Sequence, residues 1–250
     1  MQNGKINNLK NSYSKKLFLY ILLVWGSLIL SAGIVATLYL THVNELIISI
    51  VIFVLFIFLF FILLISKAKI SFYDLQQRYQ MLLNHSIGVE KTSCKFDNTW
   101  IESLQKNGYA SYLNETDFAI YYKITKSLSK RTFIKTNVLE IICIVRNNKL
   151  DFYANEIEKE FKGLWLKLEK ANRLNKQIII QFKKYDSYTE AIKTDLDRII
   201  SYKEGDNYLV NINCGYFTEN KNIYYLHSDK YSPNIYYKKA VDTIKEIINY

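Results

Sequence analysis

The chain of 250 residues has few of the residues that interrupt secondary structure or cross-link a fold: one proline, eight glycines and three cysteines. So few prolines and glycines exclude a proline-rich or glycine-rich linker and a low-complexity tract. The cysteines Cys94, Cys143 and Cys214 are odd in number and far apart. We therefore expect neither a disulfide framework nor a zinc motif of paired cysteines.

Three motifs that identify common enzyme classes are missing too. The sequence has no glycine-rich phosphate loop, no His-Glu-x-x-His helix and no paired-cysteine motif. These absences argue against a nucleoside triphosphatase and a zinc hydrolase, because such enzymes hold phosphate or metal with those motifs. We expect no cofactor and no bound metal, and whether the protein is an enzyme stays open.

Charge is absent from two long apolar runs near the N-terminus, residues 17–40 and 46–66, which excludes a purely soluble protein. As helices these runs would extend about 36 Å and about 31 Å, and the hydrocarbon core of a bilayer is about 30 Å thick. The short segment between them allows only a tight turn. The sequence therefore predicts an antiparallel transmembrane hairpin that follows a basic tail, residues 1–16.

Lysines flank the outer ends of this hairpin, and its turn carries Glu45 as its one charged residue. The flanking lysines are Lys5, Lys10, Lys15, Lys16, Lys67 and Lys69. Because basic residues stay on the cytoplasmic side, we expect a multi-pass protein of the cell membrane with both termini in the cytoplasm. A signal peptide cleaved near Ala32 is the alternative, although the apolar run continues to Leu40, beyond the length of a typical signal-peptide core.

Small residues four apart recur in the first apolar run, and such pairs let helix backbones approach closely. The pairs are Ser27/Ser31, Ala32/Ala36 and Gly33/Thr37. The second run is rich in phenylalanine, so the small residues either pack on it within one hairpin or join several hairpins into a homo-oligomer. Neither run holds Asp, Glu, Lys, Arg or His, which argues against a charged transport path.

The next segment, residues 67–88, is expected to continue as a helical stalk. Five of its residues repeat at spacings of four and three, as in a coiled coil. They are Ala68, Phe72, Leu75, Tyr79 and Leu82. Either a second chain or the protein's own domain would cover them. Gly88 ends the pattern, and residues 89–250 form the predicted cytoplasmic domain.

We expect this domain to contain a mixed sheet with packed helices, in the α/β or α+β class. Runs of β-branched and aromatic residues predict strands at residues 117–125, 137–146, 177–185, 207–217 and 222–228. Capping boxes place helices after Thr99 and Ser187, and a Ser-Pro pair places one after Ser232. A long amphipathic helix is predicted over residues 150–174, opened near Asp151.

The formal net charge of +10 suits a domain held beside a lipid bilayer with anionic headgroups. Nucleic acid is a less suitable partner, because the chain has 28 lysines and 5 arginines and Arg is the residue that makes bidentate base and phosphate contacts. The candidate binding residues lie in an acid-free segment between two predicted strands: Lys126, Lys130, Arg131 and Lys135. A solvated loop in a lysine-rich protein is the alternative.

Cys214 and His227 are candidates for thiol catalysis. Both fall on the predicted hairpin of residues 207–228, where Phe217 opposite Asn222 would make the thiol and the imidazole diagonal neighbours. A cysteine beside a histidine base is the arrangement of thiol nucleophiles. The alternative is a packed core, because the other residues on the same strand face are apolar.

The segment Gln181, Phe182 and Lys183 resembles the Gln-x-Lys variant of some restriction-type nucleases. The resemblance implies an acidic metal ligand on the preceding strand, where Glu140 is the one acid. The sequence departs from that pattern, because a long predicted helix stands where the nucleases have a hairpin.

Two further polar pairs allow two interpretations each. Asp195 and Asp197 suggest either a metal-binding pair or a solvated helix face, since neighbouring residues of a helix point to different sides. Asn211 and Asn213 share one face of their strand, which is either a polar pocket or an exposed sheet face.

These observations favour a membrane-anchored cytoplasmic binding or regulatory module, with a homo-oligomer or a protein partner as further expectations. Two alternatives stay open. One is a membrane-tethered hydrolase, either a thiol enzyme or a nuclease, and the other is a pore of assembled hairpins that the soluble domain controls.

Overall fold

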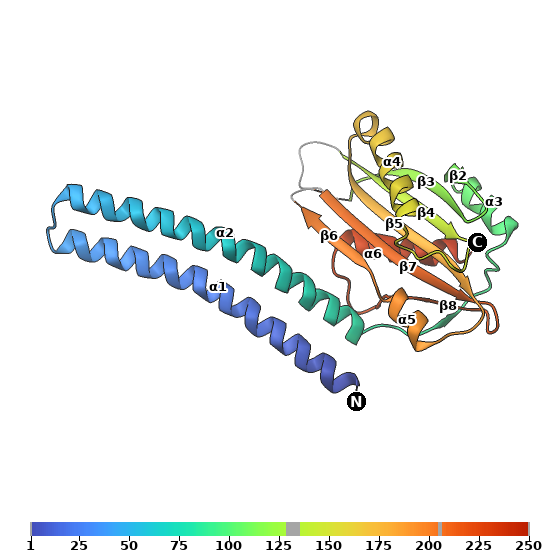
Figure 1. Cartoon of the computed structure of the whole chain (residues 1–250), viewed down its shortest axis with the longest axis horizontal. Helices are drawn as coiled ribbons and strands as arrows, with labels where there is room; N and C mark the ends of the chain where they lie inside the picture. Colours follow the sequence, from blue (N-terminus) through green and yellow to red (C-terminus); the bar gives the residue numbers. More distant parts are fainter. Residues whose placement is uncertain (1, 129–135, 205–206, 250) are drawn as a thin grey trace. The chain divides into compact units, whose positions relative to one another are not determined.

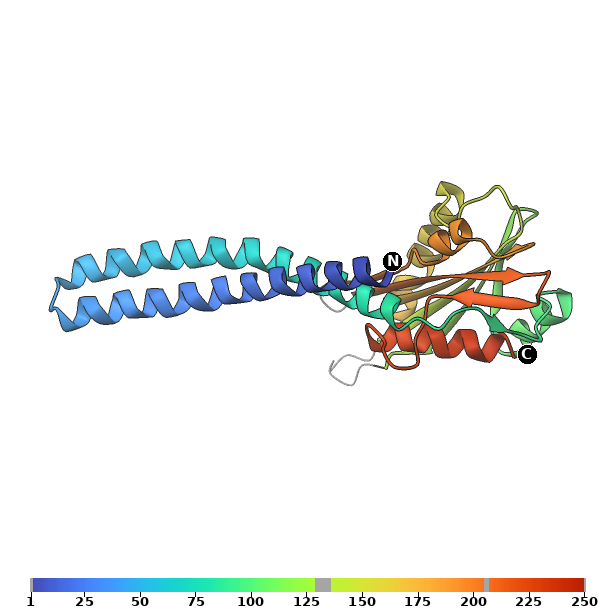
Figure 2. The same ribbon diagram turned by 90° about the horizontal axis from the view of Figure 1, so that it is seen from below.

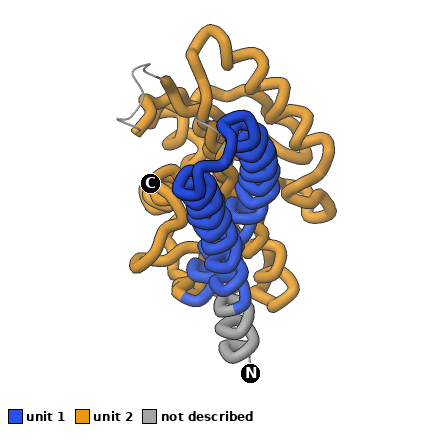
Figure 3. The backbone as a smooth tube through the Cα atoms, turned by 90° about the vertical axis from the view of Figure 1, so that its left-hand side faces the viewer, with its two compact units in different colours: residues 1–84 blue, residues 85–250 orange. Residues whose placement is uncertain are grey.

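The computed structural model describes residues 2–128, 136–204 and 207–249, with side chains from Ser12 onward (Figure 1). The chain forms two compact units, Met1–Asn84 and His85–Tyr250 (Figure 3). The first unit is helical and the second is built on a sheet, so the class is α+β with an N-terminal helical hairpin.

The first unit consists of two long helices, α1 (Gln2–Leu40) and α2 (Glu45–Asn84), joined by a short turn. Both helices are long and apolar enough to cross a bilayer. Large apolar side chains point away from the pair: Phe53, Phe56 and Phe61 are 64%, 65% and 58% exposed. A continuous apolar surface of this kind is suited to lipid rather than to water.

The helices extend beyond the predicted apolar runs, because the basic tail is part of α1 and the predicted stalk is part of α2. Tyr73 of α2 contacts Tyr13 and Tyr20 of α1, at ring-centroid distances of 6.2 Å and 5.8 Å. The stalk therefore packs on α1 through Tyr73. Phe72 and Leu75 of the predicted coiled-coil face are 50% and 36% exposed, so the protein's own residues do not cover them, and cover by a second chain stays a prediction.

The small residues of α1 divide between two faces. Ser31 is buried and Ser27 is half-buried, so this pair lies against α2. Gly33 and Ala36 are exposed, and a Cβ atom added at Gly33 would meet no other atom within 4 Å. Packing within the hairpin accounts for Ser27 and Ser31, and the outward small face stays available to the homo-oligomer hypothesis.

The second unit is built on an eight-stranded mixed sheet with the order β1-β8-β7-β5-β4-β3-β2, and β6 pairs with β7. The strands are β1 (Glu90–Lys91), β2 (Ala110–Asn114), β3 (Phe118–Lys126), β4 (Asn137–Val145), β5 (Leu174–Tyr185), β6 (Ile200–Glu204), β7 (Asn207–Phe217) and β8 (Asn222–Tyr225). At the centre of the sheet β4, β5 and β7 are parallel, and crossover connections join them in sequence. On either side, β3 pairs antiparallel with β4 and β8 pairs antiparallel with β7.

Helices cover both faces of this sheet (Figure 2). α4 (Asn155–Asn172) and α5 (Glu190–Leu196) lie on one face, and α6 (Ile235–Ile247) lies on the other. α3 (Asn98–Lys106) joins the side of α6, since the indole N–H of Trp100 donates to the carbonyl of Ile247 at 2.7 Å. Side chains alternate along each strand, so Ile141 and Ile179 form the core beneath α4 together with Leu164.

The predicted strands are confirmed with shifts of a few residues at their ends, and the sequence misses β1, β2 and β6. These three are short strands of two to five residues. Backbone pairing with a neighbouring strand makes these segments strands, and such short segments contain too few residues for an alternating pattern to be recognised in the sequence.

Three predicted helix starts are wrong by two residues each. Asp97 caps α3, Thr189 caps α5 and Asn234 caps α6, each by accepting backbone N–H groups. The sequence-based choices are Thr99, Ser187 and Ser232. Asp, Asn, Ser and Thr are similar in capping strength, so residue type alone does not show which of several nearby candidates is the N-cap. The path of the backbone determines it.

The long helix also begins later than predicted. α4 starts at Asn155, and Asp151 lies before it in a turn, where its carboxylate accepts the N–H of Tyr153 at 3.3 Å. At its other end Arg173 takes the left-handed conformation, with φ of 50°, and the chain turns directly into β5. Asp151 is thereby free of the helix and lies at the carboxyl ends of the parallel strands.

Candidate functional site

The carboxyl ends of β4, β5 and β7 bring together several of the polar residues that the sequence singles out. On the face covered by α4 and α5, Gln181 lies directly opposite Asn213, and the next residue pair places Ile179 opposite Asn211. Gln181 and Asn213 are fully buried and Asn211 is 4% exposed. The two asparagines therefore belong to a buried polar group and not to an exposed sheet face.

Hydrogen bonds hold this polar group together. The Gln181 amide N–H donates to the Asn211 side chain at 3.3 Å, and the Asn213 amide donates to the carbonyls of Asp195 and Arg198 at 3.3 Å and 2.9 Å. The Gln181 Oε1 and Asn213 Oδ1 atoms have no hydrogen-bond partner among the described residues. The interaction of Asn213 with two backbone carbonyls fixes the end of α5 on β7.

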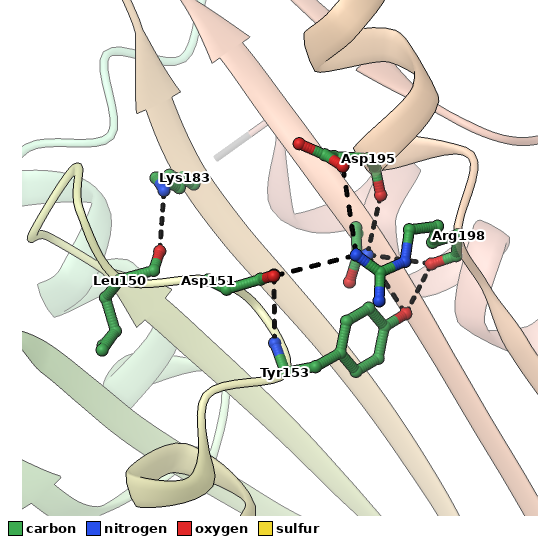
Figure 4. Close-up of polar contacts among 7 residues, drawn as sticks. Leu150, Asp151, Tyr153, Lys183, Asp195 and Arg198 are labelled. Atoms are coloured by element: carbon green, nitrogen blue, oxygen red, sulfur yellow. Dashed lines mark hydrogen bonds and ion pairs between the residues drawn. The ribbon is translucent and has the colours of Figure 1, made fainter.

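Arg198 connects the start of α4 to the end of α5 (Figure 4). Its guanidinium lies 3.7 Å from the Asp151 carboxylate and 4.0 Å from that of Asp195, and it covers the Tyr153 ring at 4.9 Å. The Tyr153 hydroxyl donates to the Arg198 carbonyl at 2.5 Å. Since the charged side chains are more than half exposed, the ion pairs add little stability, and the backbone contacts do most of the positioning.

Lys183 is the buried cation of this edge. Its Nζ donates to the carbonyls of Asn148 and Leu150 at 2.9 Å and 2.7 Å, which ties the turn before α4 to β5 (Figure 4). Burial lowers the pKa of Lys183 from its ordinary value, and the carboxylates of Asp151 and Asp195 oppose part of that effect. Lys183 therefore has a structural role, because its two hydrogen bonds hold the turn after β4.

Glu140 lies on the opposite face of the sheet from Gln181 and Lys183. In the parallel register of β4 and β5, Glu140 pairs with Ile178, so the odd-numbered Gln181 and Lys183 point the other way. The Glu140 carboxylate instead accepts from Tyr109 and Thr125 and contacts Lys239. Glu140, Gln181 and Lys183, the residues that the nuclease resemblance would place in one metal site, thus form no such site in this structure.

Asp195 and Asp197 also separate. Asp195 faces Arg198, whereas Asp197 accepts a hydrogen bond from the Tyr224 hydroxyl. Burial raises the pKa of Asp197, and the Tyr224 bond opposes this. Across the described residues, His, Cys, Asp and Glu side chains form no group of three or more that can hold a metal.

The predicted register of the β7–β8 hairpin is confirmed, since Phe217 pairs with Asn222 and Cys214 with Tyr225. His227 lies beyond the end of β8 and stacks on Tyr225, with ring centroids 4.1 Å apart. Cys214 is fully buried, and burial raises the pKa of its thiol well above the ordinary value. This environment disfavours the thiolate, which is the reactive form of a nucleophilic cysteine.

The sequence did not reveal the partner of His227. Glu90 of the short strand β1 places a carboxylate oxygen 3.6 Å from the imidazole Nε2, and the imidazole Nδ1 contacts the Tyr225 carbonyl at 3.0 Å. These contacts join β1 to the end of β8. No feature of the sequence marks them, because β1 is only two residues long.

The basic segment is only partly described. Lys126 ends β3, pairs with Asn137 of β4 and is exposed. Lys130, Arg131 and Lys135 lie outside the described residues. The exposed position of Lys126 fits both a contact with lipid headgroups and a solvated strand end.

A cavity of about 550 Å³, named the edge cavity here, lies at this edge of the sheet. It lies beside the last residues of β4 and β5 and the start of α3 (its lining residues are Phe96, Asp97, Asn98, Ile101, Ile144, Val145, Arg146, Phe182, Lys183, Lys184 and Tyr216). Its size is within the range of small-ligand sites. The sequence offered one signal for it, because Arg146 and Lys184 come at the ends of two predicted strands.

Comparison of the chain with protein-family models, with curated proteins and with solved structures finds no match.

Proposed function

We propose that this protein is a membrane-anchored binding module whose sheet domain takes a small ligand in the edge cavity. The observation that carries the proposal is the position of this cavity at the carboxyl ends of the parallel strands β4 and β5. Sheets of this type bind ligands beside the carboxyl ends of their parallel strands. An aromatic and aliphatic floor with a few polar groups at its rim is also the usual composition of a ligand site.

Binding is favoured over catalysis by the groups that line the cavity. Asp97 is the one carboxylate among the described lining residues, and it already accepts from the Thr99 hydroxyl at 2.6 Å and from the Trp100 N–H at 3.2 Å. The described lining residues include no cysteine, serine or histidine, so they offer no nucleophile with a neighbouring base.

The hairpin supplies the anchor in this proposal. α1 and α2 would cross the cell membrane, and the lysines at their outer ends would hold both termini and the sheet domain in the cytoplasm. Alkaline carbonate extraction should leave the full chain in the membrane fraction, and reporters fused to either terminus should respond as cytoplasmic. Release by carbonate, or an external reporter at either end, would contradict the anchor.

The cavity itself is tested by filling it. A fragment library is screened by ligand-observed NMR on the full chain in phosphatidylcholine nanodiscs, and the hits are repeated on an Ile101→Trp variant. Ile101 lines the cavity and is half-buried on α3, so the indole should occupy the space and abolish binding. Ile235→Trp is the matched control, because Ile235 is 51% exposed at the start of α6.

Hits that bind both variants equally, or a library without any hit, would overturn the proposal. Circular dichroism of both variants shows whether they are folded. If Ile101→Trp fails to fold, Ile101→Phe fills part of the same space and replaces it in the comparison.

Headgroup binding is a separate part of the function. Replacing Lys126, Lys130, Arg131 and Lys135 with Gln should weaken binding of the protein to anionic liposomes, most clearly at low salt, because salt screens such contacts. Binding that is unchanged at every salt concentration would remove these residues from the proposal.

A further inference from the structure

The charges around the edge cavity indicate what kind of ligand it takes, an inference that rests on the binding function proposed above. We infer that the ligand is a small organic anion, with an apolar or aromatic body and a phosphate or carboxylate at one end. Three independent features support this inference: the imbalance of charge, the fixed position of Arg146 and the aromatic floor.

Cations outnumber acids in the lining. The side chains of Arg146 and Lys184 are the cations at the cavity, and among its described lining residues Asp97 is the one acid. The Asp97 carboxylate serves as the N-cap of α3, and its hydrogen bonds to Thr99 and Trp100 hold its pKa below the ordinary value. The local field therefore favours a negatively charged ligand.

Arg146 is held in place before any ligand arrives. Its Nη1 donates to the Glu115 carbonyl at 2.5 Å, and its Nη2 donates to the Asn114 side chain at 2.8 Å. These bonds use two of the five N–H groups of the guanidinium. A fixed guanidinium loses little side-chain entropy on binding an anion, and it suits the planar oxygens of a carboxylate or phosphate.

Lys184 lies on the same side of β5 as Phe182, because residues two apart share a strand face. Its side chain is exposed at the rim. Lys183 points to the other face, where its Nζ is bonded to two carbonyls. Arg146 and Lys184 are therefore the two cations placed to contact the charged end of the ligand.

The floor of the cavity is aromatic. The Phe96 ring lies 5.2 Å from that of Phe182 and 4.8 Å from that of Tyr216, with Trp100 behind it at 4.6 Å. Phe96 has a positive φ of 51°, a strained conformation for a bulky residue and one that recurs at functional sites. The half-buried Ile101 completes an apolar surface for the body of the ligand.

The probe is phenyl phosphate, compared with inorganic phosphate in place of its charged half and with benzyl alcohol, an uncharged aromatic alcohol, in place of its aromatic half. Binding to the full chain in phosphatidylcholine nanodiscs is followed by proton and phosphorus NMR of the probes, with empty nanodiscs as the blank. Phenyl phosphate should bind more tightly than either half, because it alone engages the floor and the cations together.

Two variants should weaken this binding and one should strengthen it. Arg146→Gln and Lys184→Gln should each raise the Kd of phenyl phosphate about fivefold, the upper range for an exposed ion pair. Asp97→Asn keeps a strong N-cap and removes the carboxylate, so the Kd should fall about twofold. Lys159→Gln, an exposed lysine of α4 outside the cavity, is the matched control and should leave the Kd unchanged.

The possible outcomes separate this inference from the binding function. If benzyl alcohol binds as tightly as phenyl phosphate and the charge variants have no effect, the anion is wrong while the cavity remains a ligand site. If none of the probes binds up to millimolar concentrations, the anion is also wrong, and the fragment screen with Ile101→Trp decides the binding function by itself.

Discussion

Replacing Lys239 with methionine should destabilise the sheet domain strongly, because it leaves a buried carboxylate without its cation. Glu140 of β4 is 4% exposed, and the Lys239 Nζ of α6 lies 2.5 Å from its carboxylate. Removing one partner of a buried pair costs about 3–5 kcal/mol. The Lys239 side chain is 18% exposed, and Tyr109 and Thr125 still donate to Glu140, so we expect about 2–3 kcal/mol.

In a domain of this size the loss corresponds to a drop in apparent Tm of about 4–12 °C. The assay is thermal unfolding of the full chain in nanodiscs at neutral pH. Intrinsic tryptophan fluorescence reports on the domain, because Trp100 is 3% exposed in its core. Lys238→Met is the matched control, since Lys238 is the exposed neighbour on the same helix and its replacement should move the Tm little.

A second variant isolates the charge. Glu140→Gln combined with Lys239→Met removes both charges, so the double variant should be more stable than Lys239→Met alone. If Lys239→Met shifts the Tm no more than Lys238→Met does, or if the double variant is the less stable of the two, the argument from an uncompensated buried carboxylate is refuted.

Three further outcomes follow from local geometry. Gly215→Ala should lower the Tm, because the added Cβ would lie 2.6 Å from a methyl group of the buried Leu196; an unchanged Tm would mean that Leu196 shifts freely. Asn234→Ala should cost about 1 kcal/mol, since the cap of α6 is lost, whereas Asn234→Asp should be nearly neutral in the same melt. Burial raises the pKa of Cys94 from 9.0 to about 11, so the unfolded chain loses this proton first and stability should fall as pH rises between those values. Cys94→Ala should reduce that fall in urea titrations at each pH, and an identical pH profile would contradict the assignment.

The hairpin and the long strands could be predicted from the sequence because their signals are local. An uncharged run long enough to span a bilayer needs no partner to be recognised, and runs of β-branched and aromatic residues mark β5 and β7, which are 12 and 11 residues long. The pairing of Phe217 with Asn222 followed from the short turn between two such strands. Helix starts were less certain, since Asp97 and Thr99 are both good caps and the direction of the backbone decides between them.

The candidate site depended on information that the sequence does not carry. The carboxylate of Glu140 and the amine of Lys183 lie on adjacent strands, yet a register that pairs Glu140 with Ile178 sends them to opposite faces. The position of Arg146 beside Phe96 likewise arises from segments about fifty residues apart that meet at one sheet edge.

The sequence by itself determined the apolar hairpin, five of the described strands and the apolar character of the strand face that carries Cys214, because each depends on hydrophobic patterns along the chain. Tertiary structure decided which polar residues meet. Parallel pairing of β4, β5 and β7 aligns their carboxyl ends, and only that alignment brings Arg146 and Lys184 to one cavity while it separates Glu140 from Lys183. The physical reason is that strand register, which long-range pairing sets, fixes both the neighbour and the face of every side chain.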